Sequence, residues 1–320
     1  MYKLAVAWAF DDPLVSQLVT VRVREVRVYV PACSRRRAAL ANCSRGETGA
    51  ASRRGLYDEV QRPRRRKRPA MALPALVLVH GAGFAADCWE PTVDVIRSVE
   101  PELKVLTVDL PGRRNRAGDL TTACIDGWVN SVVSDIENAA LDDLVIVGHS
   151  LAGLTVPGVV TKLGSARVRE MILAAAQVPA NGSALVDTLP GALSWFARRT
   201  AKRNVQKGRS GGLPTALARF AFCNGMTPAQ RRFTLARSCQ ESAPIMIEKV
   251  DRSGMPDDVP RTWILTRRDR SAVSMKIQHE CIDALGGVQT LIEIDTCHML
   301  MVSEPQRLAE ILIERCRLYE

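Results

Sequence analysis

The sequence is poor in aromatic residues and lacks long apolar runs. Phe, Trp and Tyr make up 5% of the 320 residues, whereas 47% are apolar and 24% are charged. Its compact apolar stretches, such as residues 76–79 and 144–147, are far shorter than the roughly 20 residues of a membrane-spanning helix. The composition is that of an ordinary folded protein, which excludes a collagen, a fully disordered chain and a multipass membrane protein.

Closely spaced cysteines are also missing. The nine cysteines include no C-x-x-C pair, and the smallest gap separates Cys33 from Cys43. A zinc site of the usual spacing and a small disulfide scaffold are therefore not expected. Scattered thiols are typical of buried, reduced side chains, so we predict a cytoplasmic protein without a metal site.

The positive charge is confined to one part of the chain. Residues 1–70 hold 16 Lys/Arg against 6 Asp/Glu, which accounts for the whole net charge of +10, because residues 71–320 hold 28 of each. Self-repulsion and the few apolar residues after residue 30 argue against a packed core there. We expect a disordered extension, or sequence upstream of a start at Met71. The alternatives are a nuclear-import or nucleic-acid-binding arm and an organelle-targeting peptide, whereas the folded part gives no electrostatic reason to expect a nucleic-acid partner.

From Met71 onward, short apolar runs alternate with longer amphipathic stretches. The runs are continuous rather than alternating, which is typical of strands that helices cover on both faces. This pattern predicts a doubly wound, mostly parallel α/β sheet over residues 71–320. We expect the last helix to begin at Ser303, with Gln306 as its capping partner. The predicted strands are residues 75–79, 104–108, 144–147, 168–174, 261–265 and 289–294.

One long insertion interrupts the alternation. Residues 177–260 contain no convincing strand, but they contain helix-like pieces that Gly and Pro residues break. We interpret them as a helical cap over the carboxyl edge of the sheet, where open α/β sheets bind ligands. The basic stretch 198–209 is interpreted as a solvated face, with an anion site as the alternative.

The predicted strand 144–147 leads directly into a tight turn that carries a serine. A serine on a strand-to-helix turn needs small neighbours two residues before and after it, and Gly148 and Ala152 meet that need. The turn lifts the Ser150 hydroxyl above the sheet, and the first amides of the following helix favour an oxyanion in front of it. Pro157 is expected to kink that helix. The turn reads Gly148-His149-Ser150-Leu151-Ala152-Gly153.

This turn and three further features resemble those of the α/β-hydrolase family, and the resemblance covers residues 71–320. In the family's G-x-S-x-G pattern, Ala152 replaces the last glycine. The resemblance implies that Ser150 is a nucleophile. The loop His80-Gly81-Ala82 looks like the family's H-G loop, which implies that the backbone amides of Ala82 and Leu151 form an oxyanion hole.

The remaining two features imply a base and an acid. His298 follows the last predicted strand, where the family has its catalytic histidine, and Asp269 follows the strand 261–265, where the acid commonly stands. The chain order of Ser150, Asp269 and His298 is the α/β-hydrolase order. Asp295 is the rival acid, but it lies only three residues before the base. Candidate pocket residues, each also explained by ordinary core packing, are Phe84, Trp195, Phe196 and Phe220.

The resemblance implies a serine esterase that acts on a small carboxylic ester and needs neither a metal nor an organic cofactor. The H-G-A loop is most similar to the compact branch of plant methylesterases and hydroxynitrile lyases. Arg270 stands where the lyases carry lysine, which argues against cyanohydrin cleavage. Thioesterase, amidase and carbon–carbon hydrolase activities are alternatives, as is a ligand-binding receptor with little turnover.

Overall fold

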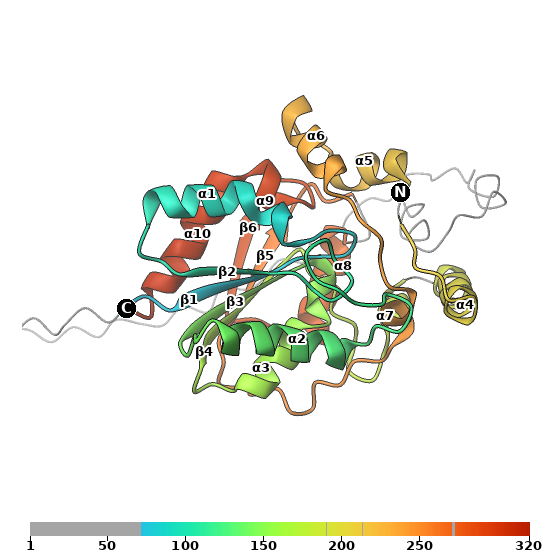
Figure 1. Ribbon diagram of the computed structural model, residues 1–320, viewed down its shortest axis with the longest axis horizontal. Helices are drawn as coiled ribbons and strands as arrows, with labels where there is room; N and C mark the ends of the chain where they lie inside the picture. Colours follow the sequence, from blue (N-terminus) through green and yellow to red (C-terminus); the bar gives the residue numbers. More distant parts are fainter. Residues whose placement is uncertain (1–71, 190, 213, 271–272) are drawn as a thin grey trace, which may run out of the picture. The chain divides into compact units, whose positions relative to one another are not determined.

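The computed structural model describes residues 72–320 except 190, 213 and 271–272. In this part of the chain a six-stranded sheet has the order β2-β1-β3-β4-β5-β6, and every neighbouring pair is parallel (Figure 1). The predicted doubly wound sheet is therefore confirmed, while the predicted extension 1–70 lies outside the described residues. The strands are β1 (Ala75–Val79), β2 (Val105–Val108), β3 (Leu144–His149), β4 (Val168–Ala174), β5 (Arg261–Thr266) and β6 (Thr290–Ile294).

Strands β1, β3 and β5 are buried along their whole length because both faces of the sheet are covered there, whereas the edge strand β6 alternates exposed and part-buried residues. Successive β1 residues point to opposite faces: Val77 joins one buried apolar cluster, and Leu76 and Leu78 join the other. Figure 1 shows α1 (Glu90–Val99) and α10 (Pro305–Arg317) on one face, and α2 (Ile125–Asn138) and α3 (Val156–Leu163) on the other. The core thus consists of two layers that sandwich the sheet.

The order of the strands creates a crevice at the carboxyl edge. Strand β1 pairs with β2 on one side and with β3 on the other. The chain leaves β1 toward α1 and leaves β3 toward α3, and these two helices lie on opposite faces (Figure 1). Loops that diverge in this way leave room for a ligand between them.

Two helix starts differ from the sequence-based expectations. Pro157 lies in the first turn of α3 and not in its middle. In a first turn the missing amide costs no helix hydrogen bond, so the predicted kink is wrong. The last helix, α10, begins at Pro305 with Glu304 as its N-cap residue. The Ser303 hydroxyl instead bonds Met299 O at 3.1 Å and Thr296 Oγ1 at 2.6 Å, so the predicted capping box is also wrong.

The insertion between β4 and β5 contains helices and no strand among its described residues. Isolated antiparallel bridges, Ala184 with Lys249 and Gly211 with Glu241, join its outgoing and returning halves. No helix within the described ranges is long and apolar enough to cross a membrane. The elements of this insertion are η4 (Leu185–Thr188), α4 (Ala192–Gln206), α5 (Thr215–Phe222), α6 (Pro228–Ala236) and α7 (Ala243–Ile247).

A buried carboxylate on β4 fastens the C-terminal helix to the sheet. Glu170 is fully buried and accepts hydrogen bonds from Arg315 on α10, the shortest at 2.7 Å. Thr262 and Tyr319 also donate to this carboxylate. A buried carboxylate with several donors is stable, but the same carboxylate without its cation carries a large desolvation cost.

Replacing Arg315 with methionine should lower the free energy of unfolding by about 3 kcal/mol, because it leaves Glu170 charged and buried without its cation. Chemical denaturation monitored by circular dichroism measures this loss. Arg307→Met is the matched control, since Arg307 is exposed and pairs only with Glu310 on the same helix, and it should change stability by less than about 0.5 kcal/mol. Equal losses in the two variants would contradict the anchoring role of Glu170.

Candidate active site

Ser150 lies at the end of β3 in a strained backbone conformation. Its φ is +51°, which a non-glycine residue adopts rarely and only where the surrounding structure enforces it. The backbone amide of Gln177 donates to Ser150 O at 2.9 Å and so holds the turn from the loop after β4. This turn, η3 (Ser150–Gly153), precedes α3 and is buried.

The close approach that the turn requires occurs at a position that the sequence pattern did not single out. A Cβ on Gly153 would lie 2.4 Å from Gln177 O, a distance that backbone atoms cannot accommodate. Ala152 is buried and carries its Cβ without difficulty. The restriction to glycine thus falls one residue later than the G-x-S-x-G spacing indicates, and the adjacent pair Ala152-Gly153 was the available signal.

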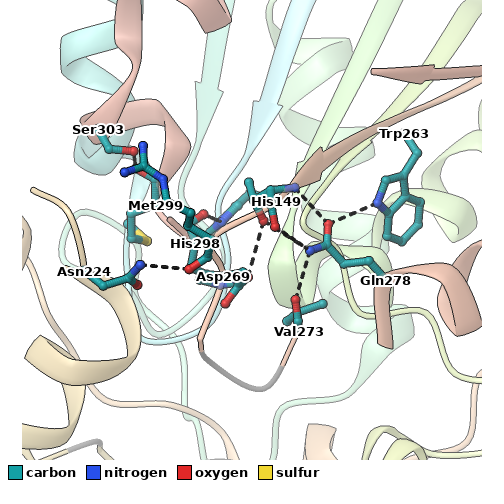
Figure 2. Close-up of polar contacts among 11 residues, drawn as sticks. His149, Asn224, Trp263, Asp269, Val273, Gln278, His298, Met299 and Ser303 are labelled. Carbon is teal, nitrogen blue, oxygen red and sulfur yellow. Dashed lines mark hydrogen bonds and ion pairs between the residues drawn. The ribbon is translucent and has the colours of Figure 1, made fainter. Parts of the chain in front are cut away.

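His298 and Asp269 meet across the loops that follow β6 and β5. His298 Nδ1 lies 2.6 Å from Asp269 Oδ2, and both side chains are buried (Figure 2). A carboxylate can only accept, so Nδ1 carries the proton and donates it, which leaves Nε2 with its lone pair. Asp295, the rival acid, is exposed and pairs with Arg268 at 3.2 Å.

His149 joins the Ser150 turn to the His298 loop. Its Nε2 donates to the backbone carbonyl of His298 at 3.0 Å, and the two imidazole rings lie 4.7 Å apart (Figure 2). The residue before Ser150 is therefore one hydrogen bond away from residue 298. Burial lowers the pKa of His149 well below its usual value, and the nearby His298 ring lowers it further, so His149 is neutral.

Backbone and side-chain bonds position the acid loop. The amide of Arg268 donates to Thr296 O at 2.9 Å, which couples the loop that carries Asp269 to the loop that carries His298. The buried Gln278 amide group bonds the backbone of Thr266 and Val273 on either side of the acid (Figure 2). Adjacent parallel strands end at the same edge, so these short links suffice to bring acid and imidazole together.

The loop after β1 lies directly against the serine turn. A Cβ on Gly81 would be 2.8 Å from Ser150 Cβ, so the two chain segments are nearly in contact. Within the described residues, the amides of Ala82 and Leu151 donate no hydrogen bond to another part of the chain. Both amides belong to the two chain segments that meet at Ser150.

His80 joins this loop to the loop that follows β2. Its Nδ1 donates to Gly81 O at 2.8 Å, and its Nε2 accepts from the Leu110 amide at 3.2 Å. Burial, together with the positive charge of Arg113, lowers the pKa of His80 to about 3. The imidazole is therefore a neutral, fixed hydrogen-bonding group.

A buried ion pair that the sequence analysis missed ties the same loop to the insertion. Glu241 Oε2 accepts from the Gly83 amide at 2.8 Å, and both of its oxygens accept from Arg113, at 2.7 and 2.8 Å. The Arg113 guanidinium also faces the Trp128 ring, 5.3 Å from its centroid. Glu241 is the first acidic residue after Asp187, and that isolation was the available signal.

A cavity of about 250 Å³ opens beside this loop. Phe222 lines it and stacks on the His298 ring, with centroids 5.3 Å apart and an angle of 27°. The candidate Phe84 is buried and packs edge-on against Phe222. The lining residues are Gly83, Gly212, Ala218, Phe222, Ser238, Cys239, Gln240 and Glu241.

The other aromatic candidates lie elsewhere. Trp195 and Phe220 are 64% and 49% exposed, and Phe196 is half-buried on α4. None of these three lines the 250 Å³ cavity. On α5, Phe220 and Phe222 are two residues apart and so point to nearly opposite sides of the helix, which places Phe222 rather than Phe220 at the imidazole.

A family model described as "Alpha/beta hydrolase family" matches residues 76–311. A carbendazim hydrolyzing esterase of Nocardioides sp. is 33% identical over 120 residues, which cover 37% of this chain and 48%, about half, of that protein. A chloroplastic protein of Arabidopsis thaliana named as methylesterase 14 is 25% identical over 258 residues, covering 77% of this chain and 72% of that one.

The fold has solved relatives as well. An extracellular alpha/beta-hydrolase from a Paenibacillus species superposes with a TM-score of 0.66 at 22% identity, over 75% of this chain and 98% of that one. The methylesterase MES16 from Arabidopsis superposes with a TM-score of 0.60 at 17% identity, over 77% of this chain and 100% of that one. At these identities the likeness concerns the fold.

The two neutral buried imidazoles predict an acid-sensitive fold. Because the folded-state pKa values of His80 and His149 lie below the ordinary 6.5, the unfolded chain binds more protons as the pH falls through that value. The free energy of unfolding should therefore decrease from about pH 7 toward pH 5. Urea unfolding across this range should show a smaller pH slope for His80→Asn, whatever its absolute stability. His279→Asn, at an exposed histidine, is the control; a slope unchanged in His80→Asn would contradict the prediction.

Proposed function

Because the chain belongs to the alpha/beta hydrolase family, which supports hydrolase activity, we propose that it hydrolyses a small carboxylic ester through an acyl-enzyme intermediate. Ser150 is the nucleophile, His298 the general base, and Asp269 the acid that orients the imidazole. The contact of 2.6 Å between His298 Nδ1 and Asp269 Oδ2 carries the proposal. It selects the tautomer whose Nε2 can take a proton, as this chemistry requires.

The proposed reaction has two halves. His298 Nε2 takes the proton of the Ser150 hydroxyl as Oγ attacks the ester carbonyl, and the amides of Ala82 and Leu151 donate to the oxyanion. The tetrahedral intermediate collapses, and His298 returns the proton to the alcohol that leaves. His298 then takes a proton from water, which attacks the acyl carbon; the bond to Ser150 Oγ breaks, the proton passes to Oγ, and the carboxylic acid product is released.

The cavity next to Gly83 supports a compact substrate with an uncharged acyl or alcohol group. Its volume of about 250 Å³ accommodates a small group, and Phe222 and Ala218 supply apolar walls. The only ionisable carboxylate in its lining, Glu241, is neutralised by Arg113. The names of the relatives, an esterase and a methylesterase, support the same class of substrate.

The proposal predicts that Ser150→Ala lowers kcat/KM at least about a thousandfold on a panel of chromogenic acyl esters, with short acyl groups preferred in the wild type. A fluorophosphonate should label Ser150, which peptide mass spectrometry detects. Ser98→Ala, at an exposed serine of α1, is the matched control and should leave both readouts unchanged. Thioesters and anilides on the same panel separate ester hydrolysis from the alternative activities. Equal turnover by the wild type and Ser150→Ala would contradict the proposal.

The buried pair predicts an asymmetric kinetic pattern. Arg113→Met leaves the Glu241 carboxylate uncompensated beside the proposed oxyanion donors, so kcat should fall about 10- to 100-fold. Adding Glu241→Gln to that variant removes the charge but keeps an acceptor for the Gly83 amide, and should recover part of the lost kcat. Steady-state kinetics measures both changes.

The control for this pattern is Arg114→Met, because the Arg114 side chain is 42% exposed, bonds the backbone carbonyl of Ala236 and has its nearest carboxylate, Asp87, at 3.7 Å. Its kcat should stay within about twofold of the wild type. A double variant slower than Arg113→Met would show that the carboxylate charge is not what slows the reaction.

A further inference from the structure

The balanced charge of the folded part conceals a strong separation. Residues 188–240 contain ten Lys/Arg and no Asp or Glu. Residues 71–187 and 241–320 together contain 18 Lys/Arg and 28 Asp/Glu, so a segment of +10 belongs to a body of −10. Within residues 71–320 the excess positive charge is therefore confined to residues 188–240, which favours an anionic partner there.

Helix α4 concentrates this positive charge on one exposed face. Residues spaced three, four, seven, eight and eleven positions after Trp195 share one side of a helix about 16 Å long between the first and last of them. We call this set the α4 stripe; it consists of Trp195, Arg198, Arg199, Lys202, Arg203 and Gln206. The opposite side of α4 is occupied, because Ala197 and Ala201 are buried and Ala197 packs with Val186 and Met246.

The cations of the α4 stripe are largely uncompensated. Arg198 pairs with Asp187, but Arg199, Lys202 and Arg203 form no ion pair within the described chain. Trp195 is 64% exposed, and the Arg199 guanidinium lies 5.8 Å from its ring centroid. Like charges on one helix face repel one another, and the exposed indole leaves apolar area in water. An anionic partner that covered this face would reduce both costs.

We propose that the α4 stripe is a docking surface for an anionic phospholipid bilayer. Each Lys or Arg at such a surface gains attraction from the headgroup charge, and an indole inserts favourably at the headgroup level. The cations lie along one side of a single helix, so a flat charged surface can reach them together.

The shape of the stripe favours a bilayer over a nucleic acid. The stripe presents a single exposed indole, whereas a single-stranded nucleic acid is bound by several aromatic side chains on which successive bases stack. Docking of the stripe does not rest on the proposed esterase activity and can be measured without it.

The test is co-sedimentation of the full chain with vesicles of phosphatidylcholine, with and without phosphatidylserine. The test variant carries Lys202→Glu and Arg203→Glu. The matched control carries Lys104→Glu and Lys276→Glu, which change the net charge equally at exposed positions outside residues 188–240. Both variants keep the segment 1–70, so its contribution cancels. Circular dichroism checks that each variant is folded, and Lys202→Gln with Arg203→Gln is a milder alternative.

The wild type should bind only vesicles that contain phosphatidylserine, and the test variant should bind them at least about tenfold more weakly, while the control changes less than about threefold. Trp195→Phe should abolish a blue shift of tryptophan emission on vesicle addition. Equal losses in both variants, or binding to neutral vesicles, would overturn the proposal. So would tighter binding of single-stranded RNA than of vesicles, or a dimer that the test variant alone dissociates.

Discussion

The backbone of Ser150 is the constraint on which the rest of the site depends. A positive φ at a serine survives only where packing leaves the chain no alternative. Here β3 is buried along its whole length, the Gln177 amide holds Ser150 O, and Gly81 and Gly153 leave no space for the turn to relax. The turn is therefore held rigidly against the loop that follows β1.

Two uses of charge coexist in the insertion. At the C-terminal end of the insertion, Glu241 is buried, pairs with Arg113 and accepts from the Gly83 amide. Its charge therefore helps to position the loop that follows β1. Along α4, the charges are exposed and the residues between them are small or polar. The Glu241 pair therefore positions a loop beside Ser150, whereas most cations of α4 form no ion pair within the described chain.

The inner strands were predictable because burial on both faces leaves a short continuous apolar run, as in β1, β3 and β5. The pairing of His298 with Asp269 was predictable for a related reason, since adjacent parallel strands end at one edge and their loops must meet. Local signals failed where two structures satisfy them equally. Pro157 suits a first turn as well as a kink, and Ser303 bonds backward to Met299 instead of capping α10.

The sequence by itself determined the sheet, the serine turn and the loops that hold His298 and Asp269, because these depend on periodicity and on small residues at fixed spacing. Only the tertiary structure decided which glycine is indispensable, which aromatic ring touches the imidazole, and that Glu241 reaches Arg113 across 128 residues. Those contacts arise where segments distant in the chain approach within a few ångströms. The separation of two residues along the chain does not predict such contacts, because they depend on how the folded segments pack.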